Sequence, residues 1–197
     1  DVQVLMLTGY TNAASAFNAA TPHARHDLLC FVREEVYLPE GWPETLLERA
    51  ARVAEADPDW AVLGALGAVR HEDEKRYAGH LRDRGEEFGS GEGLPVEVES
   101  LDDTLLVCRR ADAVFDEWMP NHHLLGTELC LRLRRDGRRC YAVDAYLHHN
   151  APDDENRLPL DCLVSCGYLY ARYPDMLPIL APRVTIQRLN GVCVLSA

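Results

Sequence analysis

Short apolar runs that alternate with helical segments constrain the fold of this chain more than any other feature of its sequence. Apolar runs lie at residues 2–7, 28–32 and 60–64, and each has the length of a buried strand. Residues 12–20, which are rich in alanine, and the amphipathic residues 44–56 separate these runs and have the pattern of helices. Strands that alternate with helices predict an α/β fold with a mixed, mostly parallel sheet flanked by helices.

The second half of the chain is less regular. Residues 68–94 are polar and rich in glycine, which predicts a surface hairpin or loop. Further strands are predicted at residues 96–100, 104–108 and 140–144, and further helices at 126–135 and 161–173.

Composition excludes several classes of function. The chain has 197 residues and a net charge of −12, so neither a nucleic acid polymer nor an anionic membrane surface would be attracted to it. A nucleotide ligand remains compatible, because a divalent cation can bridge acidic side chains to phosphates. The sequence has no apolar run of transmembrane length and no signal peptide, and its seven cysteines are typical of free thiols. We therefore expect a cytoplasmic protein of one domain.

Glu128 is the strongest single candidate for a catalytic residue. It lies in the first turn of the predicted helix 126–135, directly after Thr127, which is a suitable N-cap. One interpretation is a carboxylate that only stabilises the helix N-terminus. The other is a general base that deprotonates an acceptor hydroxyl.

His148 and His149 end a strand predicted at residues 141–147 and form a candidate metal site. Neighbouring residues of a strand point to opposite faces, so we expect at most one of the two imidazoles to reach a given pocket. The alternatives are a metal ligand and a surface imidazole with an ordinary hydrogen bond.

Acidic residues lie at the ends of two predicted strands. Arg33, Glu34 and Glu35 follow the strand at residues 28–32, and Asp102 with Asp103 precedes the strand at 104–108. In open α/β sheets ligands gather at the carboxyl ends of strands, where paired carboxylates can hold Mg²⁺ or Mn²⁺ against a diphosphate. The alternatives are a solvated charge cluster at the first position and a turn or cap at the second.

The order of these motifs resembles that of the family 2-like glycosyltransferases of the GT-A fold, in particular the StrF-type branch. The resemblance covers about residues 1–150. It is carried by residues 15–20 (SAFNAA), 28–39 (LLCFVREEVYLP), 79–85 (GHLRDRG), 95–103 (PVEVESLDD), 115–117 (FDE), 123–131 (HLLGTELCL) and 141–150 (YAVDAYLHHN).

The resemblance implies a GT-A-like catalytic domain at residues 1–150, with residues 151–197 as a C-terminal helix and extension packed on it. It implies transfer of a sugar from a nucleotide-diphosphate sugar to a hydroxyl acceptor, with Mg²⁺ or Mn²⁺ as cofactor. The roles implied for single residues are metal ligands for Glu35 and His148, the catalytic base for Glu128, and contacts with the donor for Asn18, Arg33, Asp102 and Asp103.

The chain departs from this family in four respects. Arg33 replaces a histidine of the family's metal motif, and Glu35 replaces an aspartate. Glu128 also replaces an aspartate. The first strand and helix of the family have no counterpart before Asp1, so we expect an N-terminally truncated version of the fold. A second hypothesis is therefore a catalytically inactive GT-A module for binding or assembly, and a third is a nucleotidyltransferase-like or other metal-dependent α/β enzyme.

Overall fold

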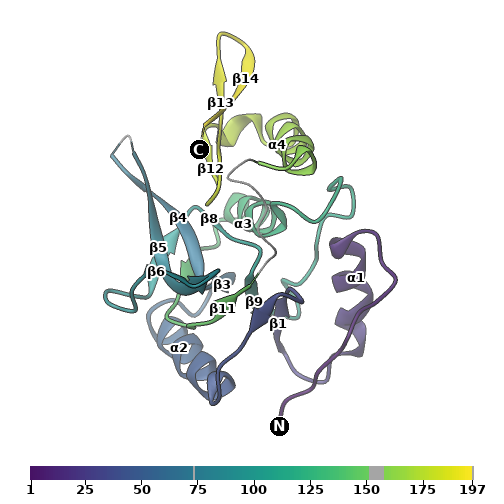
Figure 1. Cartoon of the computed structure of the whole chain (residues 1–197), viewed down its shortest axis with the longest axis vertical. Coiled ribbons are helices and arrows are strands. Elements are labelled where there is room, and N and C mark those ends of the chain that lie inside the picture. The colour runs from purple at the N-terminus through teal and green to yellow at the C-terminus, as the bar shows by residue number, and fades with distance from the viewer. Residues whose placement is uncertain (73, 151–157, 197) are drawn as a thin grey trace.

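A five-stranded sheet at the centre of the molecule separates helix α2 (Trp42–Ala56) from helix α3 (Leu125–Arg135) (Figure 1). The computed structural model of the chain describes residues 1–72, 74–150 and 158–196. In strand order, the sheet contains β1 (Leu28–Val32), β9 (Leu105–Arg109), β3 (Val62–Gly64), β10 (Cys140–Ala142) and β7 (Val96–Val98).

Side chains of the central strands alternate between two hydrophobic clusters. Leu63 and Leu105 pack with α2, whereas Val62 and Leu106 belong to the cluster that contains Leu129 of α3. Both faces of the sheet are therefore buried, which explains why these strands consist of continuous apolar runs.

The predicted GT-A fold, with a mostly parallel sheet flanked by helices, is wrong. The structure is β-rich, with 28% helix and 30% strand, and its mixed and antiparallel sheets include a curled half-barrel. Among the described residues only β10 with β3 and β11 (His148–His149) with β5 (Glu74–Asp83) pair in parallel. A strand buried on both faces has the same apolar pattern whichever way its neighbours run, so the sequence did not reveal strand direction.

A second sheet forms the curled part of the molecule. Its strands are β2 (Val36–Tyr37), β11, β5, β4 (Leu66–His71) and β8 (Ser100–Leu101), with β6 (Glu86–Gly89) paired to β5. The hairpin predicted within residues 68–94 is confirmed by the pairing of β4 with β5. Strand β5 changes partners near Gly79, which has φ +155° and would bring an added Cβ within 2.2 Å of the Ala65 carbonyl oxygen.

The C-terminal part joins the core around α3. It contains α4 (Leu160–Arg172), a 3₁₀ turn (Pro174–Met176) and an antiparallel sheet of β12 (Ile179–Leu180), β13 (Thr185–Leu189) and β14 (Val192–Ser196). Cys166 and Leu169 of α4 belong to the same hydrophobic cluster as Leu129, while the β13–β14 hairpin projects from the molecule (Figure 1). Residues 151–157, which open the predicted C-terminal segment, lie outside the described residues.

The predicted first strand at residues 2–7 is also wrong. These residues have no regular secondary structure, and Val4 and Met6 are 80% and 86% exposed. The helix that follows is confirmed as α1 (Ala13–Ala20), and the Asn12 side chain caps it by accepting hydrogen bonds from the Ala14 and Ser15 amides. A 3₁₀ turn (Thr21–His23) leads from α1 toward β1.

No helix in the described part of the chain combines the length and the apolar character needed to cross a membrane.

Candidate functional site

Several of the predicted site residues meet at one cavity of about 340 Å³. This volume lies within the usual range for small-molecule sites. The lining side chains come from distant segments that the fold brings together at the ends of β1, β5, β8 and β11. We call it the central cavity; its lining comprises Arg33, Glu35, Arg84, Leu101, Asp102, Asp103, Thr104, His122, His123, Leu124, Thr127, His149, Pro159, Asp161, Cys162, Pro182 and Arg183.

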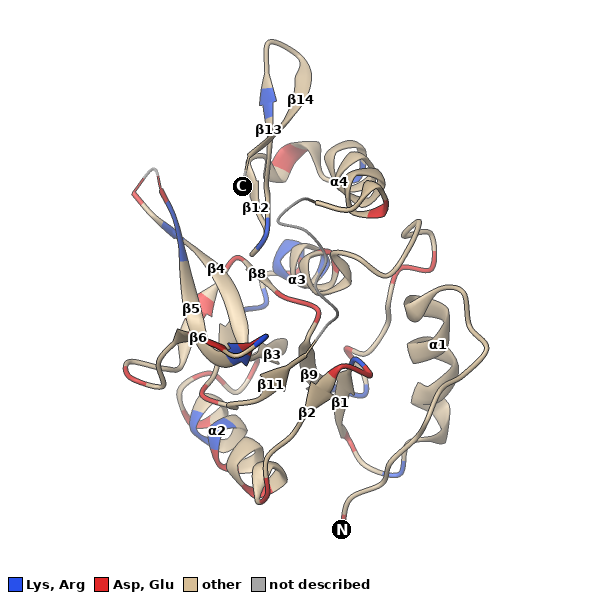
Figure 2. Ribbon diagram, viewed as in Figure 1, with Lys and Arg blue, Asp and Glu red and all other residues tan. Residues whose placement is uncertain are grey.

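Arg33 and Glu35 form a bidentate ion pair in the central cavity. The Arg33 Nε and one terminal nitrogen donate to the two Glu35 carboxylate oxygens over 3.2 and 2.8 Å. These hydrogen bonds lower the pKa of Glu35. Acidic and basic stretches of ribbon lie next to each other after β1 (Figure 2). The pair fixes the guanidinium group beside the cavity.

Asp103 ties the cavity to the start of α3. Its two carboxylate oxygens accept hydrogen bonds from the Leu124 amide over 2.7 Å and the Gly126 amide over 2.6 Å. The predicted N-cap, Thr127, lies inside the helix; the N-cap position is Leu124, with φ +64° and no side-chain cap of its own. Asp103 therefore satisfies amides of this helix end from a distant part of the sequence. Burial, followed by the charge of Asp102, raises the pKa of Asp103 to about 7.

Of the two adjacent histidines, His149 lines the central cavity. Its Nδ1 lies 2.8 Å from a carboxylate oxygen of Asp83, on the neighbouring strand β5. The carboxylate accepts from Nδ1, so Nε2 is an acceptor in the neutral ring. Among the described residues Nε2 has no hydrogen-bond partner. His148 instead contacts Tyr37 and Tyr146, with ring centroids 5.6 and 5.3 Å apart.

Glu128 and Asn18 are not among the residues that line the cavity. Glu128 is 1% exposed, and one of its oxygens accepts a 2.6 Å hydrogen bond from the Tyr173 hydroxyl. Burial raises its pKa. The Asn18 amide group exchanges hydrogen bonds with the backbone of Phe115, so it holds the loop before α3 against α1. Both side chains have clear structural partners.

The predicted metal ligands do not fit a metal centre. Both oxygens of Glu35 are bound by Arg33, and His148 is turned toward tyrosine rings. Within residues 1–72, 74–150 and 158–196, no cluster of three or more His, Cys, Asp or Glu side chains is arranged to hold a metal ion.

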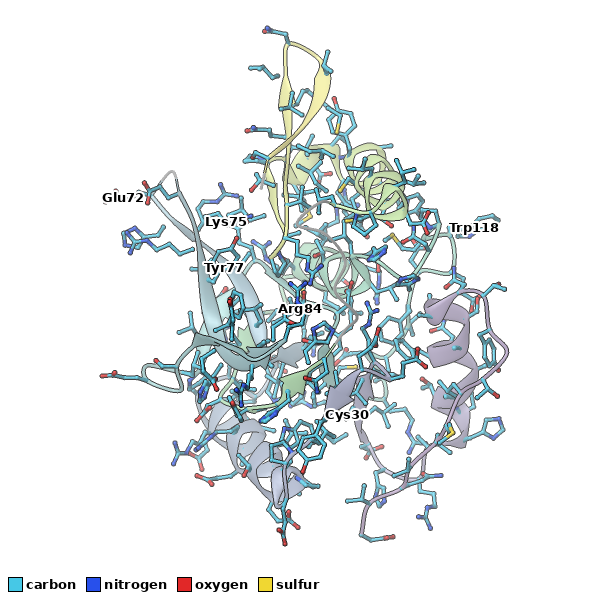
Figure 3. All side chains as sticks on the ribbon, viewed as in Figure 1. Cys30, Glu72, Lys75, Tyr77, Arg84 and Trp118 are labelled. Atoms are coloured by element: carbon cyan, nitrogen blue, oxygen red, sulfur yellow. The ribbon has the colours of Figure 1, made fainter. Side chains whose placement is uncertain are left out.

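Several cavity residues were not predicted. Arg84 occupies the turn between β5 and β6 with φ +48°, and Figure 3 shows it near the middle of the molecule. Arg183 lies between β12 and β13, far away in the sequence. His122 and His123 lie before α3 with ring centroids 4.2 Å apart, and burial lowers the pKa of His123 to about 4. Arg84 and His123 lie in segments that carry the family resemblance, but no local motif marked any of these side chains as a site residue, because only the tertiary fold brings them to the cavity.

The contact between Tyr173 and Glu128 makes a testable prediction. Tyr173→Phe leaves a buried carboxylate oxygen without its donor, so we expect the free energy of unfolding to fall by about 1–3 kcal/mol. Glu128→Gln keeps an acceptor for the hydroxyl and removes a buried acid, so we expect a change below about 1 kcal/mol. Urea denaturation measures both. The control is Tyr170→Phe, because the Tyr170 hydroxyl makes an exposed 3.3 Å contact with the Gly191 carbonyl oxygen. An equal loss of stability in this control would contradict the prediction.

No protein-family model matches the chain. The chain is similar to a protein of Fuscovulum blasticum described as "ATP synthase subunits region ORF 6", with 31% identity over 141 residues. The match covers 68% of this chain and 57% of that relative, so the chain spans less than two thirds of the length of the curated protein it matches.

Proposed function

We propose that the chain transfers a sugar from a nucleotide-diphosphate sugar to a hydroxyl-bearing acceptor at the central cavity. One observation carries this proposal. Arg33, Asp102 and Asp103, which the family resemblance associates with the donor, lie around one cavity together with Arg84 and Arg183. Arginine is the side chain best suited to phosphate, because its planar group donates two parallel hydrogen bonds.

The remaining polar groups of the cavity suit a ligand that carries hydroxyls. Exposed polar side chains belong to the cavity lining, among them His122 and Asp161. Groups of this kind can accept hydrogen bonds from a ligand that enters the cavity. Sugar hydroxyls can both donate and accept, which suits this mixture of groups.

A second candidate function is binding of the same ligand without transfer. The observation that favours it is the position of Glu128, the residue predicted as catalytic base, which is buried against Tyr173 and does not line the cavity. In this case the chain is a binding or assembly module.

For either function we propose a cytoplasmic location, supported by the absence of disulfides among its seven cysteines, all of which are free.

Binding of the donor can be tested by thermal unfolding with UDP-, GDP- and dTDP-sugars. A ligand present at 100 times its Kd stabilises the folded state by about 2.7 kcal/mol, which we expect to raise Tm by roughly 5–10 °C. Arg183→Gln should reduce the shift. Arg188→Gln should not, because Arg188 lies on the C-terminal hairpin, contacts Tyr170 of α4 and does not line the cavity. If no nucleotide sugar shifts Tm in the wild-type protein, the proposed function is wrong.

Glu128→Gln tests the role that the family resemblance implies for Glu128. If Glu128 is the base, the variant should bind the donor and lose transfer. Its burial outside the cavity instead predicts a transfer rate within about twofold of the wild-type rate. Binding without transfer in the wild-type protein would identify the binding module.

A further inference from the structure

Arg33 belongs to the sequence segment that the family resemblance associates with the metal ion, and its place in the lining of the central cavity suggests a different way to neutralise phosphate charge. Among the described residues, Glu35 and His148 are not arranged as the predicted metal site, because Glu35 is bound by Arg33 and His148 contacts tyrosine rings. The Arg33–Glu35 pair is held by two hydrogen bonds, and its side chains are only 30% and 17% exposed. A metal ion at the Glu35 oxygens would lie next to this guanidinium group and would be repelled by its positive charge.

We propose that Arg33 replaces the divalent metal ion as the fixed cation that neutralises the diphosphate of the ligand. This inference rests on the proposed function, because it concerns the same ligand at the same cavity. The guanidinium group has five N–H donors and stays charged at every physiological pH. Two of these donors hold Glu35, so three remain for phosphate oxygens.

The other carboxylates of the cavity support the same inference. Asp102 accepts a 2.9 Å hydrogen bond from the Thr104 amide, and both oxygens of Asp103 accept from amides at the start of α3. Each of these carboxylates therefore has a protein donor that it would lose or share if it bound a metal ion. Arg84 and Arg183 also line the cavity and add fixed cations around the proposed diphosphate.

Glu35 acts in this arrangement as a positioning residue. It holds the guanidinium plane from one side, so the direction of the remaining donors is set before the ligand binds. Such preorganisation lowers the entropy cost of binding. Lysine at position 33 would keep the charge but lose the two-point contact with Glu35.

The test is isothermal titration calorimetry with inorganic pyrophosphate, performed once with EDTA and once with Mn²⁺. For the wild-type protein we expect Kd values that agree within about twofold under the two conditions. Arg33→Ala should weaken binding roughly 10- to 100-fold in EDTA, the usual effect of losing hydrogen bonds from a charged donor. Arg33→Lys should give an intermediate loss. Arg188→Ala, on β13, should bind like the wild type.

The titrations with Mn²⁺ test the inference more stringently than those with EDTA. Arg33→Ala frees the Glu35 carboxylate, so Mn²⁺ should restore part of the lost affinity in this variant and in no other. The double variant Arg33→Ala with Glu35→Gln should not respond to Mn²⁺. Circular dichroism confirms that each variant is folded before titration.

Two results would overturn the inference while the proposed function stands: pyrophosphate binding by the wild type that requires Mn²⁺, or binding by Arg33→Ala in EDTA that is as tight as in the wild type. If pyrophosphate does not bind the wild type under either condition while nucleotide sugars still raise Tm, the inference is wrong and the donor is held by its sugar or base. If nucleotide sugars also fail to bind, the proposed function itself is wrong.

Discussion

Replacement of Gly126 by alanine is expected to lower the free energy of unfolding by about 3 kcal/mol, at the upper end of the usual cost of overpacking. A Cβ at this position would lie 2.8 Å from the Leu101 carbonyl oxygen and 2.9 Å from that of Asp102. Both contacts are with backbone atoms, which cannot move away by a change of rotamer as side-chain atoms can. Helix α3 must therefore move away from the segment that forms one wall of the central cavity. Urea denaturation measures the loss.

A second helical glycine provides a matched control. Gly167 of α4 has nothing within 4 Å of an added Cβ. Gly167→Ala should therefore raise the free energy of unfolding by about 0.5–1 kcal/mol, because alanine restricts the unfolded chain and favours the helix. If the two substitutions change stability by the same amount, the close approach of α3 to residues 101 and 102 is not as described.

The helices could be predicted from sequence because local signals define them. Asn12 caps α1, Pro43 lies in the first turn of α2, and Gly137 follows α3 with φ +76°. The amphipathic pattern of residues 44–56 agrees with α2, in which Leu46 and Val53 are buried. Leu47 of the same helix is 57% exposed, because periodicity alone gives the width of an apolar face only roughly.

Strand pairing could not be predicted in the same way. The run at residues 104–108 is a buried strand, as its composition indicates, but it pairs antiparallel with both β1 and β3. The direction of β9 depends on which strands pair with it, and β4, β5 and β6 lie between β9 and its partner β3 in the sequence. The apolar run at residues 2–7 has the same composition and yet forms no strand among the described residues, since a strand also needs a partner.

The candidate site could be predicted only in part, because some of its residues lie at strand ends and others reach the cavity only through the tertiary fold. Glu35 and Asp103 lie close to strand ends in the sequence, and the sheets bring these ends to the central cavity. The choice between His148 and His149 depends on which face of a two-residue strand is turned inward, and the sequence cannot settle that. Arg84 and Arg183 lie in turns whose position is set only by the folded chain.

Substitution of Asp103 by alanine should have the largest effect on stability, about 3–5 kcal/mol. The substitution removes the acceptors of two amides at the start of α3, and each buried donor left without a partner costs about 1–3 kcal/mol. The control is Asp102→Ala, which removes a single 2.9 Å contact with the Thr104 amide and should cost about 1 kcal/mol. Equal losses in the two variants would show that Asp103 is not the anchor of this helix.

The cost of Asp103→Ala should also depend on pH, in a direction set by the raised pKa of Asp103. Burial moves this pKa from its ordinary value of 3.8 to about 7, so the folded state binds more protons than the unfolded state between these values. Stability from this group is therefore complete below about pH 4 and falls as the pH rises to about 7. The difference in unfolding free energy between wild type and Asp103→Ala should be larger at pH 5 than at pH 8. A difference that grows with pH would mean that the two amides hold Asp103 ionised, with its pKa below the ordinary value.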